Sequence, residues 1–373
     1  MNFKIKKEVL FQHLNYVIKG ISNKNIRPIL NCIKFDLKQE GLYLSSTDND
    51  IAIRTFINNK NIEEDYNCGK FVVSGKYIYD IVRKLPNEII SIEEVMDSKI
   101  FISTANSSFS LNCNNVDEFP NLELNDSKNP IILSNKVLKN IFNQITFAAS
   151  TSGIKPEITG MNFKISKNIL ECTATDSYRL ARKKIVLEKA VDEEINIIIP
   201  TKNLIELSKL FSDEEENVEI HIFNNKVIFK FGTIIMLSRI INATYPDVSR
   251  LIPTEFLLTI SVSTADFYAL LDRVSLFSTE EEKNTIKLEC NGNTVIVTSN
   301  IPEIGNVEEK IEVEKNNNQN IKIAFSSKYM MEAIRVLDCE KIELSFNGEI
   351  KPIIIKNPED ENLVQLIVPI KTY

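Results

Sequence analysis

The segment Ser134–Ile145, which reads SNKVLKNIFNQI, shows the pattern that recurs most often along this chain. Its apolar residues stand at positions i, i+3, i+4 and i+7, a spacing that lines one face of an α-helix: Leu138, Ile141, Phe142 and Ile145. Five further segments repeat this spacing, near residues 6–19, 74–85, 201–211, 264–277 and 326–337. Hydroxyl residues typical of helix N-caps stand near most of the starts: Ser74, Ser134, Thr201, Thr264 and Ser326. A helical pattern that recurs six times predicts a modular scaffold.

Shorter motifs recur at intervals of roughly one third of the chain. Thr47-Asp48 is followed by Thr175-Asp176 and then by Thr298-Ser299-Asn300, each after an alternating strand-like run. We expect these pairs to form strand-end turns, in which Asp176 caps local N–H groups. The aromatic-proline pair Phe119-Pro120 recurs as Tyr245-Pro246. We therefore predict three similar domains, at residues 1–125, 126–252 and 253–373.

Within each repeat the order is strand, helix, several strands, helix and strands. The strand-like runs alternate with a period of two, as in Lys99–Ser103, and short polar turns such as Asn291–Asn293 join them. Connections this short favour antiparallel pairing. The predicted fold class is therefore α+β, with antiparallel sheets and two helices in each domain.

Composition excludes several classes of protein. The chain is 43% hydrophobic and 25% charged, as in an ordinary globular protein, and no apolar run approaches the ~20 residues that span a bilayer. Its start lacks the apolar core of a signal peptide, so we expect a cytoplasmic protein with no membrane partner. Six scattered cysteines without a C-x-x-C pair predict neither a metal site nor any other cofactor.

Charge is distributed unevenly between the predicted helices and the rest of the chain. The formal net charge is −7, yet the six helical segments together carry +7 and the remainder −14. Basic residues off the apolar stripes include Lys76, Arg83, Lys84, Lys136, Lys139, Lys202, Lys209, Arg273, Lys328 and Arg335. If the helices share one layer, its positive face suits DNA phosphates, which Lys and Arg contact without regard to base sequence. The alternative is that these residues merely occupy the solvent faces of helices.

The residues also bear on two other functional classes, an enzyme and a protein-interaction scaffold. An enzyme is disfavoured, because only His13 and His221 are available as a histidine base and His13 falls on an apolar helix stripe. The chain also lacks a P-loop and a G-x-G-x-x-G motif. A repeat-built protein-interaction scaffold that never acts on DNA stays open as the second alternative.

Two segments link the chain to a known family. One is Thr173–Ala181, reading TATDSYRLA, and the other is the terminus Leu366–Tyr373, reading LIVPIKTY. Together with Arg27–Leu30 and the threefold repeat, they resemble the bacterial DNA sliding clamp, the beta subunit of the replicative DNA polymerase III. The resemblance extends over essentially the full chain.

The resemblance implies a ring of two chains and six domains, with helices lining the hole around double-stranded DNA. A clamp loader driven by ATP would load this ring, which would tether replicative and repair polymerases and have no catalytic chemistry of its own. Short linear peptides of these partners would bind a groove that maps here to Ile158, Thr175, Ser177, Tyr178, Arg179, Leu180, Pro246, Arg250, Leu251, Leu366, Ile367, Val368, Pro369 and Ile370. Leu180, Leu251, Ile367 and Ile370 would form its apolar floor, and Arg179 and Arg250 would reach peptide oxygens. The family generally has Gly-His where this chain has Ser177-Tyr178.

Contacts outside the groove follow from the same resemblance. DNA would also meet Lys24 and Arg27 in the first long loop and Lys155 after the third helix. The homodimer would join the first domain of one chain to the third domain of the other, with Ile81 against Leu276 and Phe277. The acidic residues Glu303, Glu308 and Glu309 would face the segment Thr104–Ser108, which includes Asn106 and Ser108 but no basic residue. The ionic part of ring closure is therefore expected to be weak.

Overall fold

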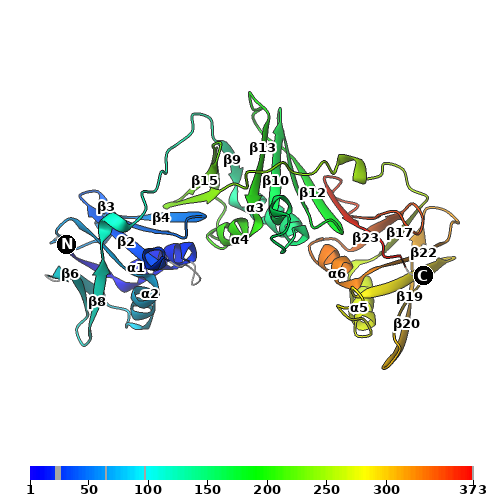
Figure 1. The fold of residues 1–373 in the computed structure, drawn as a ribbon, viewed down its shortest axis with the longest axis horizontal. Helices are drawn as coiled ribbons and strands as arrows, with labels where there is room; N and C mark the ends of the chain where they lie inside the picture. The colour runs from blue at the N-terminus through cyan, green and yellow to red at the C-terminus, as the bar shows by residue number, and fades with distance from the viewer. Residues whose placement is uncertain (22–26, 64, 96–97, 372–373) are drawn as a thin grey trace. The chain divides into compact units, whose positions relative to one another are not determined.

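The computed structural model describes residues 1–21, 27–63, 65–95 and 98–371, and its ribbon is shown in Figure 1. Within these residues the six predicted helices form, with ends that differ from the predicted ends by a few residues. They are α1 (Lys7–Val17), α2 (Gly75–Lys84), α3 (Asn135–Ile145), α4 (Thr201–Ser208), α5 (Thr264–Ser275) and α6 (Ser327–Arg335). Short 3₁₀ turns are η1 (Ile18–Gly20), η2 (Pro28–Asn31), η3 (Asn59–Asn61), η4 (Val116–Glu118), η5 (Thr146–Ala148), η6 (Pro156–Thr159) and η7 (Ser249–Leu251).

The strands form three antiparallel sheets, so the predicted α+β class is confirmed. The first sheet has the order β1 (Asn2–Lys6), β6 (Ile89–Val95), β7 (Lys99–Ser103), β8 (Ser108–Asn114), β5 (Gly69–Ser74), β2 (Cys32–Lys38), β3 (Gly41–Thr47), β4 (Ile51–Asn58), β16 (Ile234–Arg239), β15 (Lys226–Phe231), β14 (Asn217–Ile222) and β9 (Ile131–Ser134). The second runs β13 (Ile195–Pro200), β10 (Gly160–Ser166), β11 (Ile169–Thr175), β12 (Arg179–Val186), β25 (Leu363–Ile367), β24 (Ile353–Lys356), β23 (Lys341–Phe346), β17 (Leu258–Ser263) and β21 (Glu314–Lys315). The third runs β20 (Gly305–Glu312), β19 (Thr294–Ile301), β18 (Thr285–Asn291) and β22 (Ile321–Ser326).

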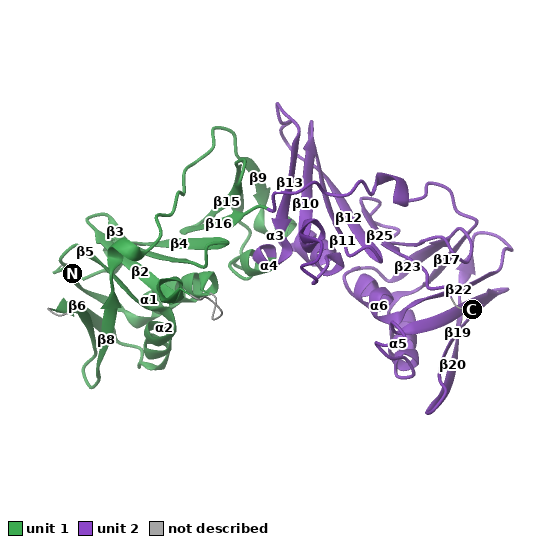
Figure 2. Ribbon diagram, in the orientation of Figure 1, with its two compact units in different colours: residues 1–138, 205–240 green, residues 139–204, 241–373 purple. Residues whose placement is uncertain are grey.

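The compact units of the chain do not coincide with the sequence repeats. One unit contains residues 1–138 and 205–240, and the other contains 139–204 and 241–373, as Figure 2 shows in green and purple. The reason is hydrogen bonding between strands of different repeats. Strand β4 pairs with β16 over Ile51–Thr55 in the first unit, and β12 pairs with β25 over Arg179–Lys183 in the second. Each half of the middle repeat is therefore built into a sheet with a neighbouring repeat.

The helices bury the stripes that the sequence predicts. In the first unit α1 and α2 pack against each other and against strands of the large sheet, and α5 and α6 pair in the second unit. Leu138, Ile141 and Ile145 of α3 are almost completely buried. The burial of these stripes holds each helix against its sheet, since a short isolated helix is only marginally stable in water.

Only some of the expected hydroxyl caps form. Ser134 and Ser326 accept hydrogen bonds from the backbone N–H groups of Val137 and Tyr329. Ser74 makes no capping bond within the described part of the chain, and Ser263, not Thr264, caps α5. The Thr298–Asn300 segment also differs from its relatives in the first two repeats, because β19 continues through it to Ile301 without a turn.

His13 lies in the core, as its place on the stripe predicts. Its Nδ1 is 2.6 Å from Oγ1 of Thr55 on β4, and burial lowers the pKa of His13 from 6.5 to about 4. The unfolded chain therefore binds more protons than the folded chain between these two values. The stabilising effect of the neutral imidazole is complete above pH 6.5 and disappears as the pH falls towards 4.

We predict that His13→Gln flattens the acid side of the stability profile. Glutamine keeps a polar partner for Thr55 but has no proton to take up, so the free energy of unfolding should change less between pH 6.5 and 4 than in the wild type. Urea unfolding at several pH values measures this. Parallel profiles for the two proteins would show that His13 is not the group responsible.

Candidate functional site

The segment Thr175–Arg179 folds into a tight turn that its own side chains stabilise. Oγ1 of Thr175 donates to the carbonyl of Arg179 at 2.6 Å, and Oδ1 of Asp176 accepts from the N–H groups of Tyr178 and Arg179 at 2.9 and 3.0 Å. These bonds match the turn-forming role expected of Thr-Asp. The turn leaves the Tyr178 side chain 54% exposed at the surface.

The first repeat contains the same turn. Oδ1 of Asp48 accepts from the N–H groups of Asp50 and Ile51, and Oγ1 of Thr47 donates to the carbonyl of Ile51. The third residue of each turn has a left-handed backbone, with φ of 77° at Asn49 and 78° at Ser177. Glycine adopts this conformation without strain, which explains why the related family generally has glycine where this chain has Ser177.

The C-terminal segment runs beside this turn. Arg179 pairs with Ile367 and Leu180 with Leu366 in the β12–β25 ladder. Beyond it, the N–H of Val368 donates to the carbonyl of Tyr178 at 2.8 Å, and the N–H of Ile370 donates to Ala324 at 2.7 Å. Pro369 has no N–H to satisfy between these two anchors, so the segment is held extended by alternate residues.

A hollow of about 570 Å³ lies between the turn, the C-terminal segment and the third repeat. It brings together four residues of the predicted groove, namely Tyr178, Val368, Pro369 and Ile370. The other lining residues are Glu280, Lys283, Asn284, Ser326, Lys328, Tyr329 and Lys371. Sequence reasoning did not place Tyr329 or the loop residues Lys283 and Asn284 in the groove, because no local motif indicates that they meet the C-terminal segment.

The remaining predicted groove residues lie outside this lining. Leu180 (2% exposed) and Leu366 belong to a core cluster with Val248, Ile354 and Val364. Ile158 and Ile367 are also buried, whereas Leu251 is 51% exposed and Pro246 and Arg250 are exposed on the connecting segment. The expected apolar floor is therefore not one surface, because Leu180 and Ile367 support the groove from within the sheet and core.

The connecting segment is anchored close to the turn by Tyr245. Burial raises the pKa of the Tyr245 phenol, whose oxygen lies near the backbone of Thr175 but has no hydrogen-bond partner among the described residues. The aromatic-proline pair thus places Pro246 near the Thr-Asp turn.

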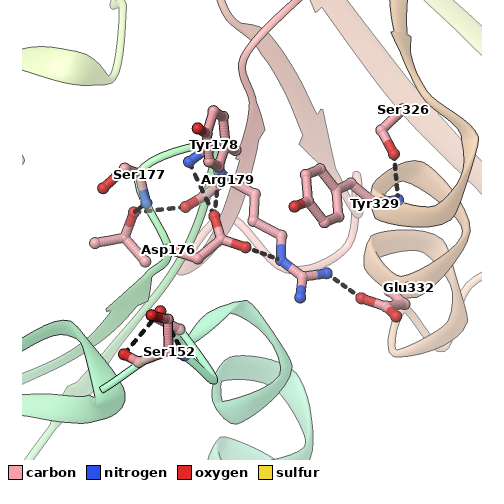
Figure 3. Close-up of polar contacts among 10 residues, drawn as sticks. Ser152, Asp176, Ser177, Tyr178, Arg179, Ser326, Tyr329 and Glu332 are labelled. Atoms are coloured by element: carbon pink, nitrogen blue, oxygen red, sulfur yellow. Dashed lines mark hydrogen bonds and ion pairs between the residues drawn. The ribbon is translucent and has the colours of Figure 1, made fainter. Parts of the chain in front are cut away.

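Arg179 is engaged inside the protein and does not project into the hollow. Figure 3 shows its guanidinium between Asp176 and Glu332, with Nε 3.0 Å from Oδ2 of Asp176 and Nη1 in contact with a Glu332 oxygen. The guanidinium also stacks over the rings of Tyr329, at 4.5 Å, and Phe147, at 5.3 Å. Because the side chain is 11% exposed and already paired, the expectation that Arg179 reaches peptide oxygens is corrected.

Comparison with known proteins identifies the family. Sequence models for the N-terminal, central and C-terminal domains of the DNA polymerase III beta subunit match residues 1–123, 132–247 and 249–371. This chain belongs to that family. Its beta sliding clamps from Staphylococcus aureus and Staphylococcus epidermidis are each 38% identical over the full length of both chains. The crystal structure of the sliding clamp from Bacillus subtilis is 36% identical with a TM-score of 0.96, and the beta chain from Streptococcus pneumoniae is 32% identical with a TM-score of 0.95, both over full lengths.

Family membership establishes the class of function. The chain is a sliding clamp of DNA polymerase III, with the three-domain α+β fold of that family. The family is that of a processivity factor without catalytic activity of its own. DNA and the polymerase are accordingly its partners.

The structure places the predicted DNA contacts at the surface. Lys24 lies outside the described residues, and the other twelve predicted cations are all exposed. Ion pairs join several of them to carboxylates: Arg83 with Asp80, Lys136 with Glu215, Lys209 with Glu206, Arg273 with Glu309 and Lys328 with Glu280. Lys328 in addition lines the hollow. The positive charge that the sequence assigns to the helices is thus partly neutralised by neighbouring carboxylates.

The predicted dimer contacts lie on two separate units. Asn106 stands in the turn before β8, and Ser108 begins that strand. Leu276 is 76% exposed at the end of α5, close in sequence to Phe277, and Glu303 and Ile304 are exposed before β20. A Cβ on Gly305 would lie 3.6 Å from the Phe277 ring, so the start of β20 lies beside that ring. Ile81 is half-buried on α2.

Among the described residues, no group of three or more His, Cys, Asp or Glu side chains is arranged to hold a metal ion. None of the helices in the described ranges combines the length and apolar character needed to cross a bilayer.

We predict that Ser177→Gly stabilises the protein. A Cβ at φ of 78° costs roughly 1 kcal/mol, and relief of this strain should outweigh the extra entropy of glycine in the unfolded chain by about 0.5 kcal/mol. The matched control is Asn49→Gly at the same φ, where asparagine already tolerates the left-handed region and the gain should be smaller. Urea unfolding compares them, and an equal gain at both sites would contradict the explanation.

Proposed function

We propose that two copies of this chain close into a ring of six domains, at residues 1–125, 126–252 and 253–373 of each copy, around double-stranded DNA. An ATP-driven clamp loader places the ring, and its groove holds short linear peptides of replicative and repair polymerases. We also propose that the ring acts in the cytoplasm, where bacterial DNA lies. The observation that carries it is the match to sliding clamps over the whole chain, from the first domain to the last.

Electrostatics support DNA as the partner that passes through the ring. Several exposed helical cations hold no ion pair within the described residues, notably Lys76 and Lys84 on α2, Lys139 on α3 and Arg335 on α6. Contacts from such residues to phosphates are independent of base sequence and allow a protein to slide. A net charge of −7 on the whole chain would repel DNA from other surfaces. That all six helices share one face stays a prediction.

Exposed strand edges and apolar residues support closure into a dimer. Strand β20 is at the edge of its sheet, and β8 pairs with β5 only through Cys113 and Asn114, which leaves most of its second edge free. Leu276 and Ile304 are large apolar residues exposed near β20. An exposed edge with apolar neighbours is suited to pairing with a second chain. Glu309, one of the carboxylates expected at this interface, already forms a bidentate ion pair with Arg273 of its own chain.

The DNA track is tested by reversing three unpaired cations, Lys76, Lys139 and Arg335, to glutamate. Retention on nicked circular DNA after addition of loader and ATP should fall about tenfold, because phosphate contacts are replaced by repulsion. The control reverses Lys164, Lys189 and Lys351, which are exposed outside the helices, and should keep wild-type retention.

Linear DNA separates the two classes of function. A topological clamp stays on circles and runs off linear ends, whereas an interaction scaffold that never acts on DNA is retained on neither. Equal retention of the wild type on both DNA forms, or normal loading of the helix triple variant, would contradict the ring proposal.

The dimer is tested by Leu276→Asp. A charge at an apolar contact that becomes buried should raise the dissociation constant of the dimer about 30-fold or more, the effect of an interface residue worth at least ~2 kcal/mol. Ile350→Asp, at a similarly exposed residue (69%) between β23 and β24, should leave it unchanged. Sedimentation of dilute protein measures both, and a purely monomeric wild type would refute dimeric closure.

A further inference from the structure

Arg179 connects two parts of the chain that are distant in sequence. It begins β12, yet its partners Tyr329 and Glu332 both belong to α6 in the third repeat. Another partner, Asp176, is in its own turn, so the guanidinium is fixed on both sides (Figure 3). Planar Arg suits this place because it can bind two carboxylates and stack on a ring at the same time. The side chains of Asp176 and Arg179 are largely buried, which strengthens their attraction relative to an exposed pair.

Tyr329 is the partner that also belongs to the hollow. Its ring lines the hollow and lies 4.5 Å from the Arg179 guanidinium. Glu332 stands three residues later on α6, so one arginine contacts two successive positions on the same helix face. Contact with both residues restrains the rotation of the Tyr329 side chain and the position of α6 beside the turn.

The first residue of α6 is also restrained at the hollow. The carbonyl of Asn284 accepts hydrogen bonds from the N–H and the hydroxyl of Ser327, at 2.9 and 3.2 Å. Lys283 and Asn284 both have left-handed backbones, with φ of 58° and 53°, and both line the hollow. The strained backbone of Lys283 and Asn284 is therefore located where α6 is attached. In sequence, Tyr329 lies between this attachment at Ser327 and Glu332, the other residue of α6 that Arg179 contacts.

We propose that Arg179 is a positioning residue of the peptide groove. It holds Tyr329 and α6 against the Tyr178 turn, so that the groove wall is already ordered before a peptide binds. The proposal rests on the peptide-binding function proposed above. Ordering the wall in the free protein lowers the entropic cost of binding, and this is how a side chain that does not touch the peptide raises affinity.

The experiment compares Arg179→Gln and Glu332→Gln with the wild type. Glutamine removes the charge at either end, and Glu332→Gln is the milder change because that side chain lies nearer the surface. The probe is a short fluorescein-labelled peptide with a Leu-Phe pair, titrated by fluorescence anisotropy. We expect about tenfold weaker binding for Arg179→Gln and about threefold for Glu332→Gln, in keeping with the loss of a stacked, ion-paired arginine. The double variant should bind no more weakly than Arg179→Gln alone, because the two residues act through one contact.

A spectroscopic readout separates positioning from general stability. Incorporation of 3-fluorotyrosine labels the ten tyrosines, and Tyr329→Phe identifies the ¹⁹F resonance of Tyr329. That resonance should shift or broaden in both glutamine variants at temperatures where their melting curves show fully folded protein. Lys164→Gln, which removes one exposed positive charge from β10 of the same unit, should change neither the resonance nor the affinity.

The possible results distinguish the positioning role of Arg179 from the peptide-binding function of the groove. If the wild type does not bind the peptide, the groove assignment fails and the positioning role fails with it. If the wild type binds and both glutamine variants bind equally well, the groove stands and the role of Arg179 is refuted. An additive loss in the double variant, or an unchanged Tyr329 resonance, refutes it as well.

Discussion

Backbone hydrogen bonds between strands of different repeats are the constraint on which the rest of this structure depends. The β4–β16 ladder makes one sheet from the first repeat and half of the second, and the β12–β25 ladder makes another from the other half and part of the third repeat. An edge strand with unpaired N–H and C=O groups is a poor end for a sheet unless it is covered or paired. Here strands of neighbouring repeats pair at these edges, β4 with β16 and β12 with β25.

The groove follows from the second of these ladders. Pairing of β12 with β25 fixes the turn at Thr175–Arg179 beside the residues that follow Ile367, and Val368 then bonds to Tyr178. The same pairing brings the first residue of β12 within reach of α6. The peptide groove and the internal ion-paired network therefore both result from one strand alignment. Tyr178 lines the hollow, whereas the next residue, Arg179, forms ion pairs inside the protein.

Features that depend on near neighbours in sequence were predictable. The period of 3.6 residues gave all six helices, because burial of a stripe such as Leu138, Ile141 and Ile145 overrides weaker local preferences. The Thr-Asp turn was also expected, since both of its side chains bond within four residues. The threefold repeat further indicated how many domains to expect.

Features that depend on distant partners were not predictable from one sequence. Nothing near Arg179 indicates that Glu332 neutralises it, and nothing near Arg273 indicates Glu309. Counting helical charges consequently overstated the free positive charge. The place of Tyr329 in the hollow likewise depends on an approach of the C-terminal segment that only the folded sheet creates. Strand order across repeats was missed for the same reason.

The joining of β12 to β25 has a consequence for the time course of synthesis. Residues 179–186 leave the ribosome long before residues 363–367 exist, so the edge of β12 waits unpaired while nearly half of the polypeptide is translated. Until then the nascent chain presents a row of open backbone groups, the kind of surface that chaperones shield and that aggregation exploits. Strand β25 therefore completes the second unit only after nearly half of the chain has followed β12, and a chain released before residue 363 would keep this edge of β12 unpaired.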